Sequence, residues 1–391
     1  MACIVVARCW TSKSKPPAAR QWNWAAAETF LPHVMCAELA YGFNGAGNVL
    51  AIDAMGGDHG PVEVVAGVRL ALHKKSTPTR ILLVGDQATL QKLLKDEGMT
   101  HDERVKIVHA SEVIGMDEKP IAALKQKKDS SMVRAIELVK DGHAQAVLSQ
   151  GNTGALMAGG TLRLRPMEGI NRPALASVIP SRGHRFVLID AGANPDGDPV
   201  HLMHNALLGN QYARCALGIK HPRVGLLTIG TEEGKGSDKI LQAHDLFKSA
   251  NGVMNYVGPV EGFQLFRNEV DVVVCDGFTG NILLKTLESC FFMLKGFLKE
   301  ELKANPMRTA GALLSQGAYK AMMHELNPEA LGGAPLLGLN RLVIKSHGSS
   351  TRGYIAGAIR IAGEALAHDL TGAIRGDLDK LGEAGGASGG K

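Results

Sequence analysis

The stretch best suited to chemistry is residues 147–160, where a short apolar run meets a turn of small and polar residues. Val147 and Leu148 are typical of the end of a buried strand, and residues 155–158 of the first turn of a helix. Backbone N–H groups and the positive end of the helix dipole would then converge on the turn. This arrangement suits an anion, most of all phosphate. The plainer interpretation is an ordinary strand-to-helix turn with a capped helix, because short glycine-rich turns are common.

The residues of this turn offer hydrogen-bond donors of two kinds. Gly151 and Gly154 have no side chain, so a ligand can approach the backbone N–H groups closely. Ser149, Asn152 and Thr153 add side-chain donors. We predict that Ser149, Gly151, Thr153 and Gly154 bind phosphate and that Asn152 takes part in catalysis.

Other polar segments also follow predicted strands. In sheets of parallel strands, ligands collect at the carboxyl ends of the strands. We therefore expect these segments to converge on the same site as the turn. The segments are residues 53–61, 116–131, 190–196, 276–281 and 345–350. Their candidate residues are Asp53, Asp58, His59, Lys127, Lys128, Asn194, Asn281, Lys345 and His347.

The elements that would position these residues alternate regularly. From Asn48 onward, short apolar runs are followed by glycine-rich loops and then by segments of helical period. Such alternation is typical of a mostly parallel sheet with helices on both faces. The predicted fold class is α/β, with a Rossmann-like, doubly wound sheet. The predicted strands are residues 49–52, 80–84, 105–109, 146–148, 172–179, 186–190, 223–229, 270–275 and 341–344.

A helical hairpin is predicted at residues 282–323. The first helix, 282–303, carries leucine and phenylalanine on one face and charged residues on the other, and the second spans 307–323. Four occupants of the apolar face remain open: a second subunit, an acyl chain, a membrane surface, or the protein's own core.

The domain organisation follows from composition along the chain. Residues 48–381 form the α/β domain. Residues 1–47 hold all three tryptophans and show no regular period, so we expect a disordered extension or an early start codon. Residues 382–391 are rich in glycine, alanine and serine, which favours a disordered tail.

Charge and cysteine content exclude several classes. The formal net charge of +5 over 391 residues is small, and no basic stripe with interleaved aromatics occurs, which excludes a nucleic-acid-binding protein. The six cysteines form no CxxC pair and no Cys/His cluster of zinc spacing, so we expect reduced thiols. Asp53 and Asp58 have no third ligand spaced with them, and we expect them to fix loop geometry rather than bind metal. No apolar run approaches the ~20 residues of a membrane span.

Six ordered motifs together resemble one family. The segments 51–61, 116–131, 151–155, 190–194, 276–281 and 344–350 are similar to those of the bacterial phosphate acyltransferases of phospholipid synthesis, the PlsX family. The resemblance covers roughly residues 48–368. Two departures are Gln150, where the family commonly has alanine, and Thr231, where it commonly has an acidic residue.

The resemblance implies an activity and partners. Proteins of this family move a fatty acyl group reversibly from acyl carrier protein to inorganic phosphate, and a membrane acyltransferase then uses the acyl phosphate on glycerol 3-phosphate. It implies no cofactor, a cytoplasmic homodimer, and contact with the inner face of the membrane through the hairpin. It also implies a fold similar to phosphate acetyltransferases and isopropylmalate dehydrogenases.

This reaction suggests roles for the candidate residues. Phosphate is already anionic and a thiolate leaves readily, so the protein needs only to position phosphate and stabilise an oxyanion. Lys127 and Lys345 would add charge at the phosphate. Further catalytic candidates are Lys128, Asn194, Asn281 and His347. Plainer roles remain open: the 127–128 pair also suits a solvated helix start, the two asparagines also suit structural bonding, and for His59 we favour a hydrogen bond within its loop over proton donation.

Two rival functions use the same residues differently. A metal- and NAD-dependent decarboxylating dehydrogenase would need a cofactor loop and an aspartate set for Mg²⁺, and the sequence offers neither. A membrane-surface scaffold that binds acyl carrier protein would explain the hairpin but not the polar turns at strand ends.

Overall fold

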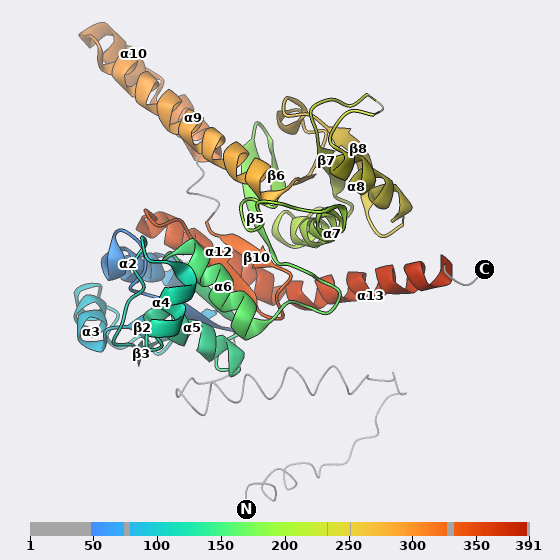
Figure 1. The fold of residues 1–391 in the computed structure, drawn as a ribbon. Helices are drawn as coiled ribbons and strands as arrows, with labels where there is room; N and C mark the ends of the chain where they lie inside the picture. The colour runs from blue at the N-terminus through green and yellow to red at the C-terminus, as the bar shows by residue number, and fades with distance from the viewer. Residues whose placement is uncertain (1–47, 74–78, 233, 251, 327–331, 389–391) are drawn as a thin grey trace, which may run out of the picture.

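The computed structural model describes residues 48–73, 79–232, 234–250, 252–326 and 332–388 (Figure 1). The predicted extension, residues 1–47, lies outside them. Eleven strands form one sheet in the order β3-β2-β1-β4-β11-β10-β5-β6-β9-β7-β8. The strands are β1 (Asn48–Asp53), β2 (Thr79–Gly85), β3 (Val105–His109), β4 (Ala146–Ser149), β5 (Ala174–Ser181), β6 (His184–Ile189), β7 (Arg223–Leu227), β8 (Asn255–Val260), β9 (Val272–Val274), β10 (Ala334–Leu337) and β11 (Leu342–Lys345).

Helices cover both faces of this sheet, which confirms the α/β prediction. One core, with α2, α3, α7, α8, α12 and α13, lies on one face, and a second core with α4, α5 and α6 lies on the other. The helices are α2 (Gly60–His73), α3 (Gln87–Asp96), α4 (Pro120–Gln126), α5 (Ser131–Lys140), α6 (Thr153–Leu164), α7 (Pro199–Ala216), α8 (Asp238–Ser249), α9 (Gly277–Lys303), α10 (Pro306–Leu314), α11 (Gln316–Leu326), α12 (Arg352–Ala367) and α13 (Leu370–Ser388).

The two halves of the sheet run in opposite directions. β1, β4 and β11 are parallel to one another. β10 is antiparallel to both β11 and β5, and β5 is antiparallel to β6. The parallel set β6, β9, β7 and β8 therefore opposes the first half. The carboxyl ends of β6 and β9 lie at the opposite edge from those of β1, β4 and β11, so the expected convergence of all the polar segments on one site is wrong.

Two strands escaped prediction because their sequences are poor in strand formers. β8 contains Gly258 and Pro259 and is the outermost strand, where proline is tolerated. β10 contains Pro335 and follows two glycines. It is one of the central strands that reverse the sheet, so missing it hid the change of direction.

The hairpin is an arm of three helices, α9, α10 and α11, that stands out from the body (Figure 1). α9 begins at Gly277, where Asp276 caps its first turn, and it is longer than predicted. The predicted second helix is divided at Ser315 into α10 and α11. No helix of the described residues is long and apolar enough to cross a membrane.

The predicted disordered tail is helical in part. α13 continues to Ser388, through most of residues 382–391, and the last three residues lie outside the described ranges. A helix that is already formed and packed at Leu370 and Ile374 adds further turns without a new nucleation cost, even where glycine is frequent.

Gly280 fixes the base of the arm against the sheet. A Cβ atom there would lie 1.9 Å from the carbonyl oxygen of Asp190. We expect Gly280→Ala to lower the free energy of unfolding by at least about 2 kcal/mol, since the backbone cannot yield cheaply. Gly296→Ala, on the same helix but with open space at its Cβ, is the matched control and should stabilise by up to about 1 kcal/mol. Urea denaturation of both variants measures this, and equal effects would contradict the close approach.

Candidate functional site

Three neighbouring strands end in polar side chains that lie side by side. Asp53 of β1 pairs with Ser149 of β4, and Ser149 pairs with Lys345 of β11. Their side chains share one face of the sheet, since the residues two positions earlier belong to the core under α4, α5 and α6. We call Asp53, Ser149 and Lys345 the polar row.

The first two members of the polar row bond within the protein. The Ser149 hydroxyl donates to Asp53 Oδ2 at 2.7 Å and accepts the N–H of Gly151 at 3.0 Å. Asp53 Oδ1 accepts the N–H groups of Met55 and Gly56 at 3.3 Å each. Asp53 therefore shapes its loop. The Ser149 hydroxyl and the Gly151 N–H, which we expected to bind phosphate, are engaged elsewhere, and this part of the expectation needs correction.

Lys345 is the cation of the row. Its side chain is buried, and Nζ donates to the carbonyl oxygen of Ser346. Burial lowers the pKa of Lys345 to about 8, against the opposing attraction of Asp53 and Asp58. An ammonium has three donors. A lysine that remains protonated at neutral pH, with donors to spare, can hold an anion here.

Asn152 caps α6 and holds a neighbouring loop. Its Oδ1 accepts the N–H of Ala155 at 3.0 Å. Its Nδ2 donates to the carbonyl oxygens of Met116 at 2.8 Å and Glu118 at 3.0 Å, with a longer contact to Gly115 at 3.3 Å. Both donor hydrogens are thus used inside the protein. The predicted catalytic donor is, in this geometry, a positioning residue.

The first turn of α6 leaves backbone donors open. The N–H groups of Thr153 and Gly154 have no acceptor within the described part of the chain, while that of Ala155 is capped. Gly154 lets the start of α4 pack against this turn, because a Cβ there would lie 2.6 Å from Pro120 Cγ. These two N–H groups and the dipole of a 12-residue helix retain the character of an anion site.

The lysines of the 116–131 segment lie at the same edge of the sheet. Lys127 Nζ forms an ion pair with Glu118 and donates to the carbonyl oxygen of Val113 at 2.7 Å. Its charge is therefore largely neutralised within its own loop. Lys128 is exposed, and no ion pair joins it to another described residue. Of the two, Lys128 is free to meet an anion.

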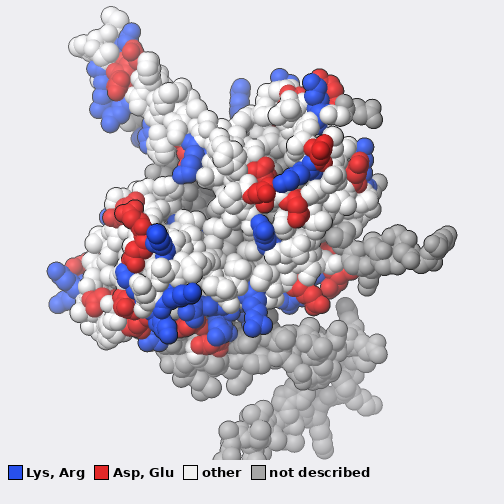
Figure 2. Space-filling model, viewed as in Figure 1, with Lys and Arg blue, Asp and Glu red and all other residues white. Residues whose placement is uncertain are grey.

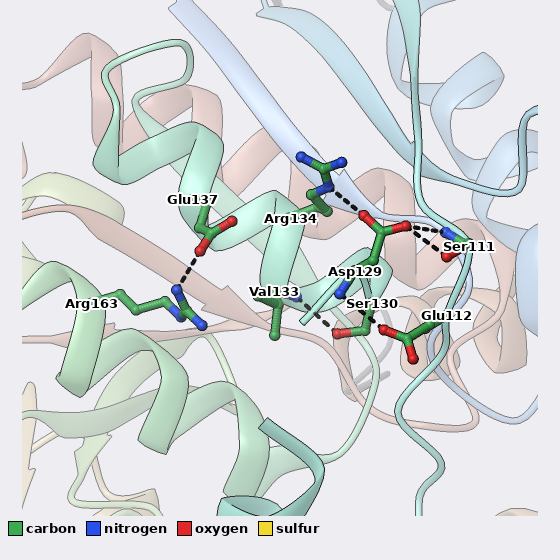
Figure 3. Close-up of polar contacts among 8 residues, drawn as sticks. All are labelled: Ser111, Glu112, Asp129, Ser130, Val133, Arg134, Glu137 and Arg163. Carbon is green, nitrogen blue, oxygen red and sulfur yellow. Dashed lines mark hydrogen bonds and ion pairs between the residues drawn. The ribbon is translucent and has the colours of Figure 1, made fainter. Parts of the chain in front are cut away.

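The backbone beside Lys128 is tightly fixed (Figure 3). Asp129 accepts from the N–H and hydroxyl of Ser111 at 3.0 and 2.6 Å and from Arg134 Nε at 2.6 Å. These bonds, led by the Ser111 hydroxyl, lower the pKa of Asp129 to about 2. Ser130 caps α5 by accepting the N–H of Val133 at 3.4 Å. The loop that carries Lys128 therefore keeps its position from mildly acidic pH upward.

The remaining candidate residues at this edge of the sheet are more exposed to solvent. Asp58 and His59 are exposed, and the N–H of Asp58 donates to the carbonyl oxygen of Gly348 at 2.8 Å. His347 is exposed, and its Nδ1 lies 2.8 Å from Ser349 Oγ. His347 thus shapes its own loop, and the contact between Asp58 and Gly348 joins two of the polar segments.

Sequence reasoning passed over Gln150 as a site residue. Its side chain is 2% exposed, and neither amide atom has a partner among the described residues. It lies under Gly57, whose Cβ would meet Gln150 Cγ at 2.7 Å. The sequence did carry a signal for this residue, because the resembled family commonly has alanine at this position. A buried amide without hydrogen-bond partners is costly, so a glutamine here is unexpected in a core.

Asn194 and Asn281 lie elsewhere, at the opposite edge. Asn194 Nδ2 donates to the carbonyl oxygen of Pro173 at 2.8 Å and to Asp190 Oδ2 at 3.0 Å. Burial raises the pKa of Asp190, although the N–H groups of residues 192–194 oppose that shift. Asn281 is exposed beside Gly192. The structure therefore does not bring these two asparagines to the polar row, because β6 and β9 run against β4 and β11.

In the described residues no group of three His, Cys, Asp or Glu side chains is placed to hold a metal ion. The described cysteines, Cys215, Cys275 and Cys290, are free thiols.

Comparison with known proteins agrees with this fold. The chain resembles a phosphotransacetylase from Streptococcus pyogenes with a TM-score of 0.54 at 18% identity, over 86% of this chain and 99% of that one. It also resembles the EutD phosphotransacetylase from Staphylococcus aureus, with a TM-score of 0.52 at 12% identity, over 85% and 98%. At such identities the likeness shows the fold alone.

Sequence comparison is more specific. A phosphate acyltransferase from Caldanaerobacter subterraneus subsp. tengcongensis is 44% identical over 335 residues, covering 85% of this chain and 98% of that protein. Another from Geobacillus thermodenitrificans is 43% identical over 333 residues, covering 85% and 99%. A family model described as "Fatty acid synthesis protein" matches residues 48–372. The chain therefore belongs to the phosphate acyltransferase family of fatty acid synthesis proteins.

Proposed function

We propose that this protein transfers a fatty acyl group between acyl carrier protein and inorganic phosphate, forming acyl phosphate for phospholipid synthesis. The site assignment rests on the buried Lys345, which pairs in the sheet with Ser149. Ser149 comes shortly before Thr153, where α6 begins with backbone N–H groups that have no acceptor among the described residues. This pairing supplies both a positive charge and backbone donors for phosphate.

The chemistry asks for positioning rather than a protein nucleophile. A phosphate oxygen attacks the thioester carbonyl carbon, a C–O bond forms, and the C–S bond breaks. The thiolate leaves with the electron pair and takes a proton from water. Lys345 and the N–H groups of Thr153 and Gly154 hold the phosphate, Lys128 adds charge from the loop, and Asn152 keeps that loop against α6.

The arm supports two further proposals, a homodimer and contact with a membrane surface. Its apolar side chains are strongly exposed, and such patches normally meet a partner. Figure 2 shows uncharged surface along the arm, with Lys and Arg next to Asp and Glu near its tip. We propose that the outer part of α9, around Phe297, meets a second copy and that the tip, with Met307 and Leu314 beside Arg308, lies on an anionic lipid surface. There a membrane acyltransferase would take the product to glycerol 3-phosphate.

The test is formation of acyl phosphate from palmitoyl-acyl carrier protein and phosphate, trapped with hydroxylamine. We expect product only when phosphate is present. A well-folded protein that yields no acyl phosphate would overturn the proposal, and absorbance of NADH in the presence of a 2-hydroxy acid would favour the dehydrogenase.

Phosphate binding should weaken at alkaline pH. Lys345 has a pKa of about 8 and carries its charge below that value, so the charge is lost as pH rises through it. We expect kcat/KM for phosphate to fall by up to about tenfold per pH unit above this point. Lys345→Arg, which stays charged, should move the fall to higher pH. Kinetics between pH 7 and 9.5 measure both, and identical profiles would contradict the role of Lys345.

A further inference from the structure

An apolar cavity of about 210 Å³ lies at the base of the arm. Leu284, Leu287 and Phe291 of α9 form one wall, and residues 177–180 of β5 form the other. Gly333, just before β10, closes one side. An apolar cavity of about 150 Å³ in a protein core stays dry and binds benzene, so this cavity has room for several methylene groups.

The cavity lies next to the polar row. Lys345 pairs with Ala334 of β10, and extending the printed register of β10 and β5 by two residues places Ala334 opposite Ser177. Two strand spacings, about 10 Å, therefore separate Lys345 from the cavity lining at Ser177. Ala334 packs against the same apolar cluster as Leu284 and Leu287, so the cavity and the Lys345 side chain share one face of the sheet.

A glycine just before β10 lets the chain pack closely on β11. A Cβ at Gly333 would lie 2.8 Å from the carbonyl oxygen of Lys345 and 2.6 Å from Ile344 Cγ2. A side chain at this position would collide with β11 on the face opposite the polar row, where Ile344 and Ala358 belong to the other core. One extended molecule can reach both the cavity and the phosphate position, because only about 10 Å of sheet separates them.

We propose that this cavity holds the fatty acyl chain of the substrate. The inference rests on the proposed function and adds a place for the chain. A thioester carbonyl held at the polar row has its thiol arm on the solvent side, so its hydrocarbon tail must run along the sheet. The apolar face of β5 and α9 begins within about 10 Å of that point, and burying the tail there removes it from water.

The first test is chain-length preference. Leu287→Trp fills the cavity, so we expect kcat/KM for palmitoyl-acyl carrier protein to fall at least tenfold while that for butyryl-acyl carrier protein changes less than threefold. Leu246→Trp, an exposed leucine on α8, is the control and should leave both unchanged. Equal losses for both chain lengths, or no loss for either, would overturn the proposal.

The second test measures whether the cavity is occupied, without catalytic turnover. Cys290 lines the cavity and is exposed, so its rate of alkylation by N-ethylmaleimide can be followed by mass spectrometry of the full chain. In phosphate-free buffer, palmitoyl-acyl carrier protein should slow alkylation at least fivefold and butyryl-acyl carrier protein should not. Equal slowing by both, or none by either, would overturn the chain site.

The two tests separate the inference from the function. If no chain length yields acyl phosphate but palmitoyl-acyl carrier protein still protects Cys290, the function fails and the cavity assignment stands. If acyl phosphate forms while Cys290 is protected only by raising the protein concentration, a second copy covers the cavity and the assignment fails.

Discussion

Replacement of Lys345 by methionine is expected to lower kcat/KM for phosphate by about 10²–10³-fold, the range seen when one electrostatic contact to a transition state is removed. The same variant should be at least as stable as the wild type. Burial holds the pKa of this lysine at about 8, below its value of 10.5 in an unfolded chain. Between those values the unfolded state binds more protons, so the free energy of unfolding rises with pH, and at neutral pH the buried charge is a net burden.

The measurement pairs phosphate kinetics with thermal denaturation. Lys345→Arg serves as the control because it keeps the charge. It should retain more activity than the methionine variant but gain no stability. The assignment is that Lys345 binds the anion and that its buried charge lowers the stability of the protein. It would be contradicted if the methionine variant bound phosphate normally, or if that variant lost activity only because it unfolds.

Asn152→Asp should destabilise the protein by about 2–4 kcal/mol while keeping the cap of α6. Aspartate caps helices as well as asparagine does. However, the variant places a carboxylate against the carbonyl oxygens of Met116 and Glu118, which now accept from Asn152 Nδ2. Buried acceptors that lose their donor, and face a like charge instead, cost this much. Acyl transfer should fall about 10²-fold, mostly in kcat, because the loop that carries Lys128 shifts.

A matched control exists at the tip of the arm. Asn305 caps α10 by accepting the N–H of Arg308 at 2.9 Å, and Asn305→Asp should change stability by less than about 0.5 kcal/mol. Chemical denaturation and steady-state kinetics of both variants give the comparison. If Asn152→Asp folds like the wild type and raises only the KM for phosphate, Asn152 contacts phosphate directly, as its sequence context first indicated.

The sequence predicted the elements better than their directions. Apolar runs before glycine-rich turns located most strands, since a buried parallel strand leaves that pattern. The reversal at β10 and β5 left no such pattern, because Pro335 and its glycine neighbours are typical of a loop. As a result, Asn194 and Asn281 were grouped with a site at the other edge of the sheet.

The donors within the site could not be assigned from residue types. Ser149, Asn152 and Lys127 are all suited to bind an anion, yet each is bonded within the protein. Lys345 was one candidate among several, and only its burial beside Asp53 sets it apart. Spacing shows which donors are near one another, whereas tertiary contacts decide which of them remain free.

The most direct test of this account is a crystal structure of the protein with bound inorganic phosphate. We predict that a phosphate oxygen lies within hydrogen-bond distance of Lys345 Nζ and that another accepts from the N–H groups of Thr153 and Gly154. Phosphate bound at the opposite edge, beside Asp190 and Asn281, with the polar row unchanged, would contradict the central claim.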